Sequence, residues 1–137
     1  MSKRRVGLVF AGVVAVAIVS ITCFSFCGAQ QPFYWTISVS DARAMMQSSS
    51  NPLVVDVRTP QEYAQGHLKG AVNIPLSDLP LRMDGLDHNR PMVVYCQTGV
   101  RSAQGSSLLV RAGFAKVFSM EGGISAWINS GYPTVSP

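Results

Sequence analysis

Short apolar segments recur along the chain, and each is followed by a polar loop and then by a stretch that favours helix. Apolar runs of this length are typical of strands buried in a parallel sheet. We expect strands at residues 35–39, 53–55, 71–74, 92–95 and 117–119, and helices at 42–47, from 60, at 77–82, 102–112 and 124–129. The alternation predicts an α/β domain with a central parallel β-sheet flanked by helices. Domains of this kind bind their ligands beyond the carboxyl ends of the strands.

The N-terminal segment has the pattern of an export signal. Lys3, Arg4 and Arg5 precede an uncharged, mostly apolar stretch at residues 6–29, and small residues come before Gln30. We therefore expect a signal peptide at residues 1–29, cleaved after Ala29. The stretch is also long enough to cross a bilayer, so an uncleaved inner-membrane anchor stays open. In both cases residues 30–137 are expected to form one periplasmic domain, in contact with a membrane only if the segment is uncleaved.

The net charge of +4 gives no indication of a nucleic-acid partner. Three of the basic residues lie in the N-terminal segment, which leaves eight basic and seven acidic side chains in residues 30–137. A net charge of +1 spread along the chain does not form the basic surface that DNA or RNA binding requires. We therefore expect no nucleic-acid partner.

Cys96 is the cysteine that remains once Cys23 and Cys27 are assigned to the N-terminal segment. It follows the expected strand at 92–95 and opens a polar loop that leads into a helix. Backbone N–H groups in such a loop can form an anion cradle, Gly99 permits a tight turn, and Arg101 adds positive charge. These features favour a reactive thiolate, although an inert buried thiol remains the alternative.

Three segments, taken in order, resemble the rhodanese family. They are residues 56–63 with 66–75, residues 95–102, and residues 122–127 with 131–133. The resemblance implies a rhodanese-like three-layer domain over residues 30–137, with Cys96 as the catalytic thiol that carries sulfur as a persulfide. It also implies that no metal or organic cofactor is needed. The substrate-binding residues would be those of the loop: Gln97, Thr98, Gly99, Val100, Arg101 and Ser102.

The partners implied are a small anionic sulfur donor, such as thiosulfate, and a thiol or cyanide acceptor. An alternative is a sulfur carrier that delivers its persulfide to a protein without rapid turnover. Related phosphatases and arsenate reductases share the fold, but those phosphatases have five residues between cysteine and arginine. Here Cys96 and Arg101 are separated by four, which favours sulfur transfer. Thr98 and Glu62 stand where some two-domain rhodaneses place cations, which puts efficient use of thiosulfate in doubt.

Other polar and aromatic residues have competing interpretations. Asp56 and Arg58 end a strand beside the expected site, where they could orient Arg101 or frame the cradle, but a structural ion pair is the preferred interpretation. Glu62 is expected to complete a helix capping box with Thr59. The residues expected to be structural are His67, Trp35 and Trp127, the two tryptophans as parts of the core.

Overall fold

The computed structural model describes residues 33–137, and the predicted signal peptide or anchor at 1–29 lies outside them. In this described part of the chain, five strands form one sheet in the order β1-β5-β4-β2-β3, and the pairings between these strands are all parallel. The strands are β1 (Trp35–Ile37), β2 (Leu53–Asp56), β3 (Val72–Asn73), β4 (Met92–Tyr95) and β5 (Val117–Met120). The predicted α/β class and central parallel sheet are confirmed.

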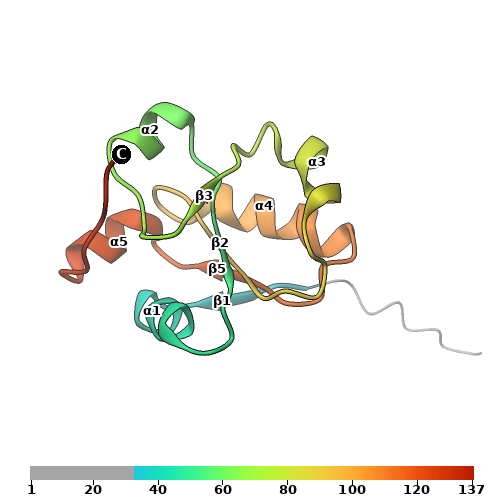
Figure 1. The fold of residues 1–137 in the computed structure, drawn as a ribbon, viewed down its shortest axis with the longest axis horizontal. Helices are drawn as coiled ribbons and strands as arrows, with labels where there is room; N and C mark the ends of the chain where they lie inside the picture. The colour runs from blue at the N-terminus through green and yellow to red at the C-terminus, as the bar shows by residue number, and fades with distance from the viewer. Residues whose placement is uncertain (1–32) are drawn as a thin grey trace, which may run out of the picture.

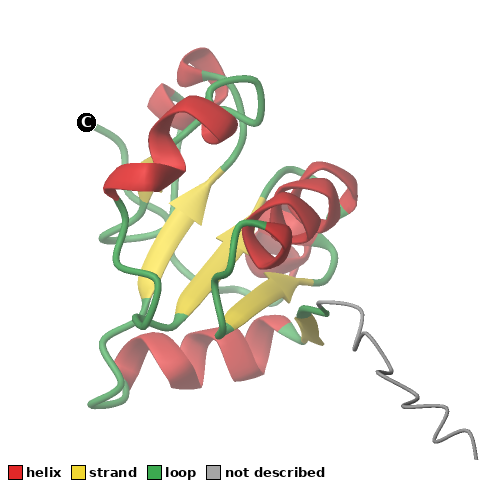
Figure 2. Ribbon diagram, turned by 90° about the vertical axis from the view of Figure 1, so that its right-hand side faces the viewer, coloured by secondary structure: helices red, strands yellow, loops and turns green. Residues whose placement is uncertain are grey.

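Helices lie on both sides of this sheet, as Figure 2 shows. They are α1 (Val39–Gln47), α2 (Pro60–Ala64), α3 (Leu79–Arg82) with the 3₁₀ turn η1 (Met83–Gly85), α4 (Val100–Arg111) and α5 (Gly123–Asn129). α4 packs against β4 and β5, whereas α1 and α5 contact each other (Figure 1). Within residues 33–137, no helix has both the length and the apolar character needed to cross a membrane.

The core is divided into two clusters because successive side chains of a strand point to opposite faces of the sheet. Val55 and Val94 pack with Leu109 of α4 on one face. Val54 and Tyr95 pack with residues of α1 and α5 on the other face. All four residues of β4 are buried, so both faces of this strand are covered, and it ends directly before Cys96.

Some element boundaries differ from the sequence predictions. The first helix begins at Val39, because the Ser38 hydroxyl accepts the Asp41 backbone N–H at 3.1 Å and caps it there. The helix predicted to begin at Ser102 begins at Val100, because Gly99 already caps it. The capping box of α2 is present as predicted. Trp127 is buried as predicted, but the core prediction for Trp35 is wrong, because an edge strand leaves its side chain 41% exposed.

Candidate active site

Cys96 lies directly beyond the carboxyl end of β4, where a parallel sheet presents its binding edge. Its side chain is 1% exposed, and the three residues that follow connect it to the start of α4. β4 lies between β5 and β2, so the neighbouring strands fix the position of the thiol from both sides. The loop is therefore held at its first residue by the sheet and at its end by a helix.

Backbone N–H groups of this loop surround the sulfur. Gly99 adopts a φ of +104°, and its N–H donates to Cys96 Sγ at 3.1 Å. Burial alone would raise the pKa of the Cys96 thiol. Hydrogen bonds from the backbone of Ser102, Gly99 and Thr98, and from the Ser102 hydroxyl, stabilise the thiolate and bring the pKa below its ordinary value of 9.0. The loop predicted from the sequence as an anion cradle therefore directs hydrogen-bond donors at Cys96 Sγ.

The carbonyl groups of the same loop are turned away and held by α5. Ile124 donates its backbone N–H to the Cys96 carbonyl at 2.8 Å, and Ser125 donates to the Gln97 carbonyl at 3.1 Å. Gly123 makes this approach possible: its φ is +59°, and an added Cβ would lie 2.4 Å from the Cys96 oxygen. These three residues were not among the predicted site residues, although the adjacent glycines Gly122 and Gly123 before a helix were a usable signal.

Two buried serine hydroxyl groups, those of Ser102 and Ser119, form a chain of contacts that begins at the sulfur of Cys96. The thiol of Cys96 donates a long hydrogen bond to Ser102 Oγ at 3.8 Å, and the Ser119 hydroxyl donates a hydrogen bond to Ser102 Oγ at 3.2 Å. With Cys96 as a thiol, the Ser102 hydroxyl donates to the Gly99 carbonyl at 2.9 Å, and its proton has to turn to the sulfur to stabilise the thiolate. Ser102 was a predicted site residue, whereas Ser119 on β5 was not, because only the sheet order brings it next to α4.

Arg101 is directed toward α2. Its two terminal nitrogens donate to the two carboxylate oxygens of Glu62 at 2.8 and 2.7 Å. Hydrogen bonding from Arg101 is the main reason why the pKa of Glu62 falls to about 2. Glu62 therefore has a role beyond its capping box, and Arg101 carries its positive charge as half of an ion pair.

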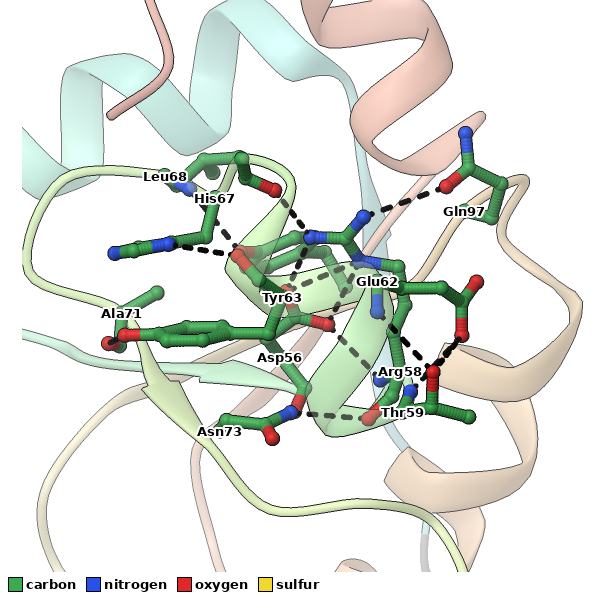
Figure 3. A network of polar contacts seen from close by, with 12 residues as sticks. Asp56, Arg58, Thr59, Glu62, Tyr63, His67, Leu68, Ala71, Asn73 and Gln97 are labelled. Atoms are coloured by element: carbon green, nitrogen blue, oxygen red, sulfur yellow. Dashed lines mark hydrogen bonds and ion pairs between the residues drawn. The ribbon is translucent and has the colours of Figure 1, made fainter. Parts of the chain in front are cut away.

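Asp56 and Arg58 form a separate, buried ion pair (Figure 3). Arg58 Nη2 donates to Asp56 Oδ2 and to the Gly66 carbonyl, both at 2.7 Å, while its Nη1 reaches Gln97 Oε1 only at 3.4 Å. Arg101 donates to Glu62 rather than to this pair, and the idea that Asp56 and Arg58 orient Arg101 or frame the cradle stays a prediction. The preferred interpretation, a structural ion pair, agrees with these contacts.

The remaining predicted residues to be located are Gln97, Val100, Thr98 and His67. The Gln97 amide donates to Ser125 Oγ at 2.9 Å, and Val100 is 65% exposed. Thr98 contributes its backbone N–H to the cradle. His67 contacts the Tyr63 carbonyl at 3.0 Å and stacks on the Tyr63 ring, which agrees with the structural role expected for it.

Residues 33–137 thus form an α/β domain in which a buried cysteine, Cys96, begins an amide-lined loop at the end of the central strand. The Rhodanese-like domain model matches residues 38–130, and the chain therefore belongs to the rhodanese-like family. A sulfurtransferase of Allochromatium vinosum is 38% identical over 92 residues, which cover 67% of this chain and 86% of the relative.

Two further comparisons agree with this family. Thiosulfate sulfurtransferase GlpE of Vibrio cholerae is 33% identical over 97 residues, covering 71% of this chain and 91% of that protein. The crystal structure of a rhodanese-related protein from Thermoplasma volcanium has a TM-score of 0.69 at 34% identity, and the match covers 76% of this chain and 100% of that one. The family is thus one whose named relatives include sulfurtransferases.

Proposed function

We propose that the domain is a sulfurtransferase that carries sulfur on Cys96. The observation that carries the proposal is the donation of the Gly99 N–H to Cys96 Sγ at 3.1 Å, in a loop that lowers the pKa of this thiol. A low pKa makes the thiolate available as the attacking group. The names of the relatives support sulfur transfer as the reaction class.

The reaction has two displacement steps. The Cys96 thiolate attacks the outer sulfur of a donor such as thiosulfate, a new S–S bond forms, and the donor's S–S bond breaks with its electron pair leaving on sulfite. An acceptor nucleophile, cyanide or a thiolate, then attacks the outer sulfur, and Cys96 leaves as a thiolate. The cradle suits both resting forms because the thiolate and the persulfide are anions.

The test is intact-mass analysis of the protein after exposure to thiosulfate or to inorganic polysulfide. We expect an adduct of one sulfur atom on the native protein and none on the Cys96→Ser variant. An equal adduct on both proteins, or none with either donor, would show that the proposal is wrong. Hydrolysis of an aryl phosphate by the native protein but not by Cys96→Ser would favour the phosphatase alternative instead.

A sulfur carrier is distinguished from an enzyme by turnover. Repeated transfer from thiosulfate to cyanide supports the enzyme, whereas a stable persulfide that is unloaded only by a protein thiol supports the carrier. The site of action proposed for either is the periplasm, and the export signal predicted for residues 1–29 supports this proposal.

A further inference from the structure

A pocket of about 230 Å³ opens between α1, α5 and the turn before β3. It lies on the side of the sheet that α1 and α5 cover, whereas the Cys96 side chain belongs to the core cluster under α4. Its lining residues, all from the described part of the chain, lie outside the loop at 96–102; they are Arg43, Met46, Gln47, Lys69, Trp127 and Pro133. The pocket is therefore separate from the site proposed for sulfur transfer.

Two positive charges line this pocket without a carboxylate partner. The side chains of Arg43 and Lys69 are exposed, and the ion pairs within residues 33–137 involve other basic residues. Residues 1–32 contain no aspartate or glutamate, so they supply no carboxylate side chain either. Guanidinium and ammonium groups only donate hydrogen bonds, and two like charges at one pocket attract an anion. The polar part of a matching ligand is therefore an anion.

An aromatic ring holds the guanidinium of Arg43 in place. The Arg43 Cζ lies over the Tyr132 ring, 4.5 Å from its centroid, and this ring packs edge to face on Trp127 with 5.0 Å between centroids. A guanidinium that stacks through its face keeps the N–H groups at its edge available to a ligand. Those N–H groups form a planar fork that matches the two oxygens of a carboxylate. The anion that suits this pocket best is therefore a carboxylate.

The wall of the pocket beside these charges is apolar. Trp127 is 4% exposed, and its Nε1 donates to the Pro133 carbonyl at 2.9 Å. Because this N–H is satisfied, the indole presents apolar surface to the pocket, as Met46 does. An inorganic anion would lose hydration against this wall without gaining apolar contacts. The volume is below the roughly 300 Å³ at which sites for drug-sized ligands begin, so the apolar part of the ligand is small.

We infer that this pocket binds a small organic carboxylate. Its carboxylate would lie at Arg43 and Lys69, and its apolar part would pack on Trp127 and Met46. The side-chain amide of Gln47 adds a further hydrogen-bond donor at the rim. Binding here is noncovalent and needs no sulfur on Cys96, so the inference goes beyond the proposed function.

The experiment titrates three probes into the full chain of residues 1–137. They are phenylacetate, its uncharged analogue phenylacetamide, and acetate, which lacks the ring. Binding is followed by the indole N–H NMR signal of Trp127, which the Trp35→Phe variant assigns because the chain has two tryptophans. We expect a saturable shift with phenylacetate, with a midpoint of about 1 mM, and about fivefold weaker binding of the other two probes.

Two variants and a matched control test the role of the charges. Arg43→Gln and Lys69→Gln should each weaken phenylacetate binding about two- to fivefold, as the loss of an exposed ion pair does. Arg82→Gln is the control, because Arg82 is an exposed arginine of α3 outside the pocket lining, and it should bind as the native protein does.

Equal affinities of the native protein for phenylacetate and either other probe would overturn the inference. So would the absence of a saturable shift with phenylacetate below about 10 mM, or equal losses of affinity in Arg43→Gln and Arg82→Gln. The Cys96→Ser variant should bind phenylacetate with native affinity. Failure of the proposed function therefore shows separately, as the missing mass adduct.

Discussion

Gly123→Ala is expected to lower the reactivity of the Cys96 thiol, although the added methyl group meets the backbone of the loop and not the sulfur. The added Cβ would lie 2.4 Å from the Cys96 carbonyl oxygen and 2.6 Å from the Gln97 carbonyl carbon, whereas ordinary contact begins at 3.4 Å. Both neighbours are backbone atoms, so the loop or α5 must move by about 1 Å. A shift of that size breaks the hydrogen bonds from Ile124 and Ser125 that hold the two carbonyls away from the sulfur.

The magnitude follows from geometry and strain. A misplacement of about 1 Å at a reacting centre costs about 100-fold in rate, and overpacking costs about 1–3 kcal/mol of stability. The φ of +59° adds left-handed strain for alanine. Because the Gly99 N–H would no longer face Cys96 Sγ, the pKa of the thiol should rise toward its ordinary value, and alkylation at neutral pH should slow.

The assays are the pH dependence of Cys96 alkylation by iodoacetamide, steady-state sulfur transfer and urea unfolding. Gly131→Ala is the matched control, because Gly131 also has a positive φ, +75°, but nothing lies within 4 Å of its added Cβ. It should lose stability through strain alone and keep the native alkylation midpoint. A Gly123→Ala protein with a native midpoint and a transfer rate within twofold of native would refute this account of the cradle.

Three further substitutions test the other contacts. Ser102→Ala should raise the pKa of Cys96, because it removes a hydroxyl that stabilises the thiolate, and an unchanged alkylation midpoint would contradict this. Asp56→Ala leaves the guanidinium of Arg58 buried without its partner and should cost about 3–5 kcal/mol in urea unfolding, so a loss under 1 kcal/mol would argue against the ion pair as a structural element. The pKa of the Glu62 carboxyl group is lowered to about 2 in the folded protein. Its contribution to the free energy of unfolding is therefore complete above about pH 4.5 and is lost as the pH falls toward 2. Because the pair is partly exposed, that contribution is about 0.2–1 kcal/mol. Glu62→Gln should remove this part of the acid dependence. Identical acid unfolding curves for the native protein and the variant would contradict the prediction.

Local patterns were sufficient to predict the sheet, because its strands are short apolar runs with clear turn signals. The predicted strand at 92–95 matches β4 residue for residue, and the capping box at Thr59 and Glu62 places α2. Trp35 was misjudged because residue type does not reveal an edge strand. Within residues 33–137, β1 pairs only with β5, and Trp35 on this edge strand is 41% exposed.

The candidate site was predictable only where its residues are neighbours in sequence. The loop from Cys96 to Ser102 was found because a strand, a glycine and a helix follow one another within a few residues. Glu62, Ser119 and Gly123 come from three other segments, and the fold alone brings them to the loop. Even Arg101, which the sequence placed at the cradle, could not be paired correctly without the position of α2.

The contacts of the cradle also bear on the choice between sulfur transfer and phosphate chemistry. A phosphatase loop must keep its amide N–H groups free for the oxygens of a bound phosphate, and its arginine must reach them. In this loop the Gly99 N–H is directed at Cys96 Sγ itself, and both terminal nitrogens of Arg101 are engaged by Glu62. When Cys96 takes up one outer sulfur, the negative charge moves from Sγ to the adjacent sulfur atom, and the loop has to stabilise it there. A phosphate would require the Arg101–Glu62 pair to open, and this difference supports the persulfide proposal over the phosphatase alternative.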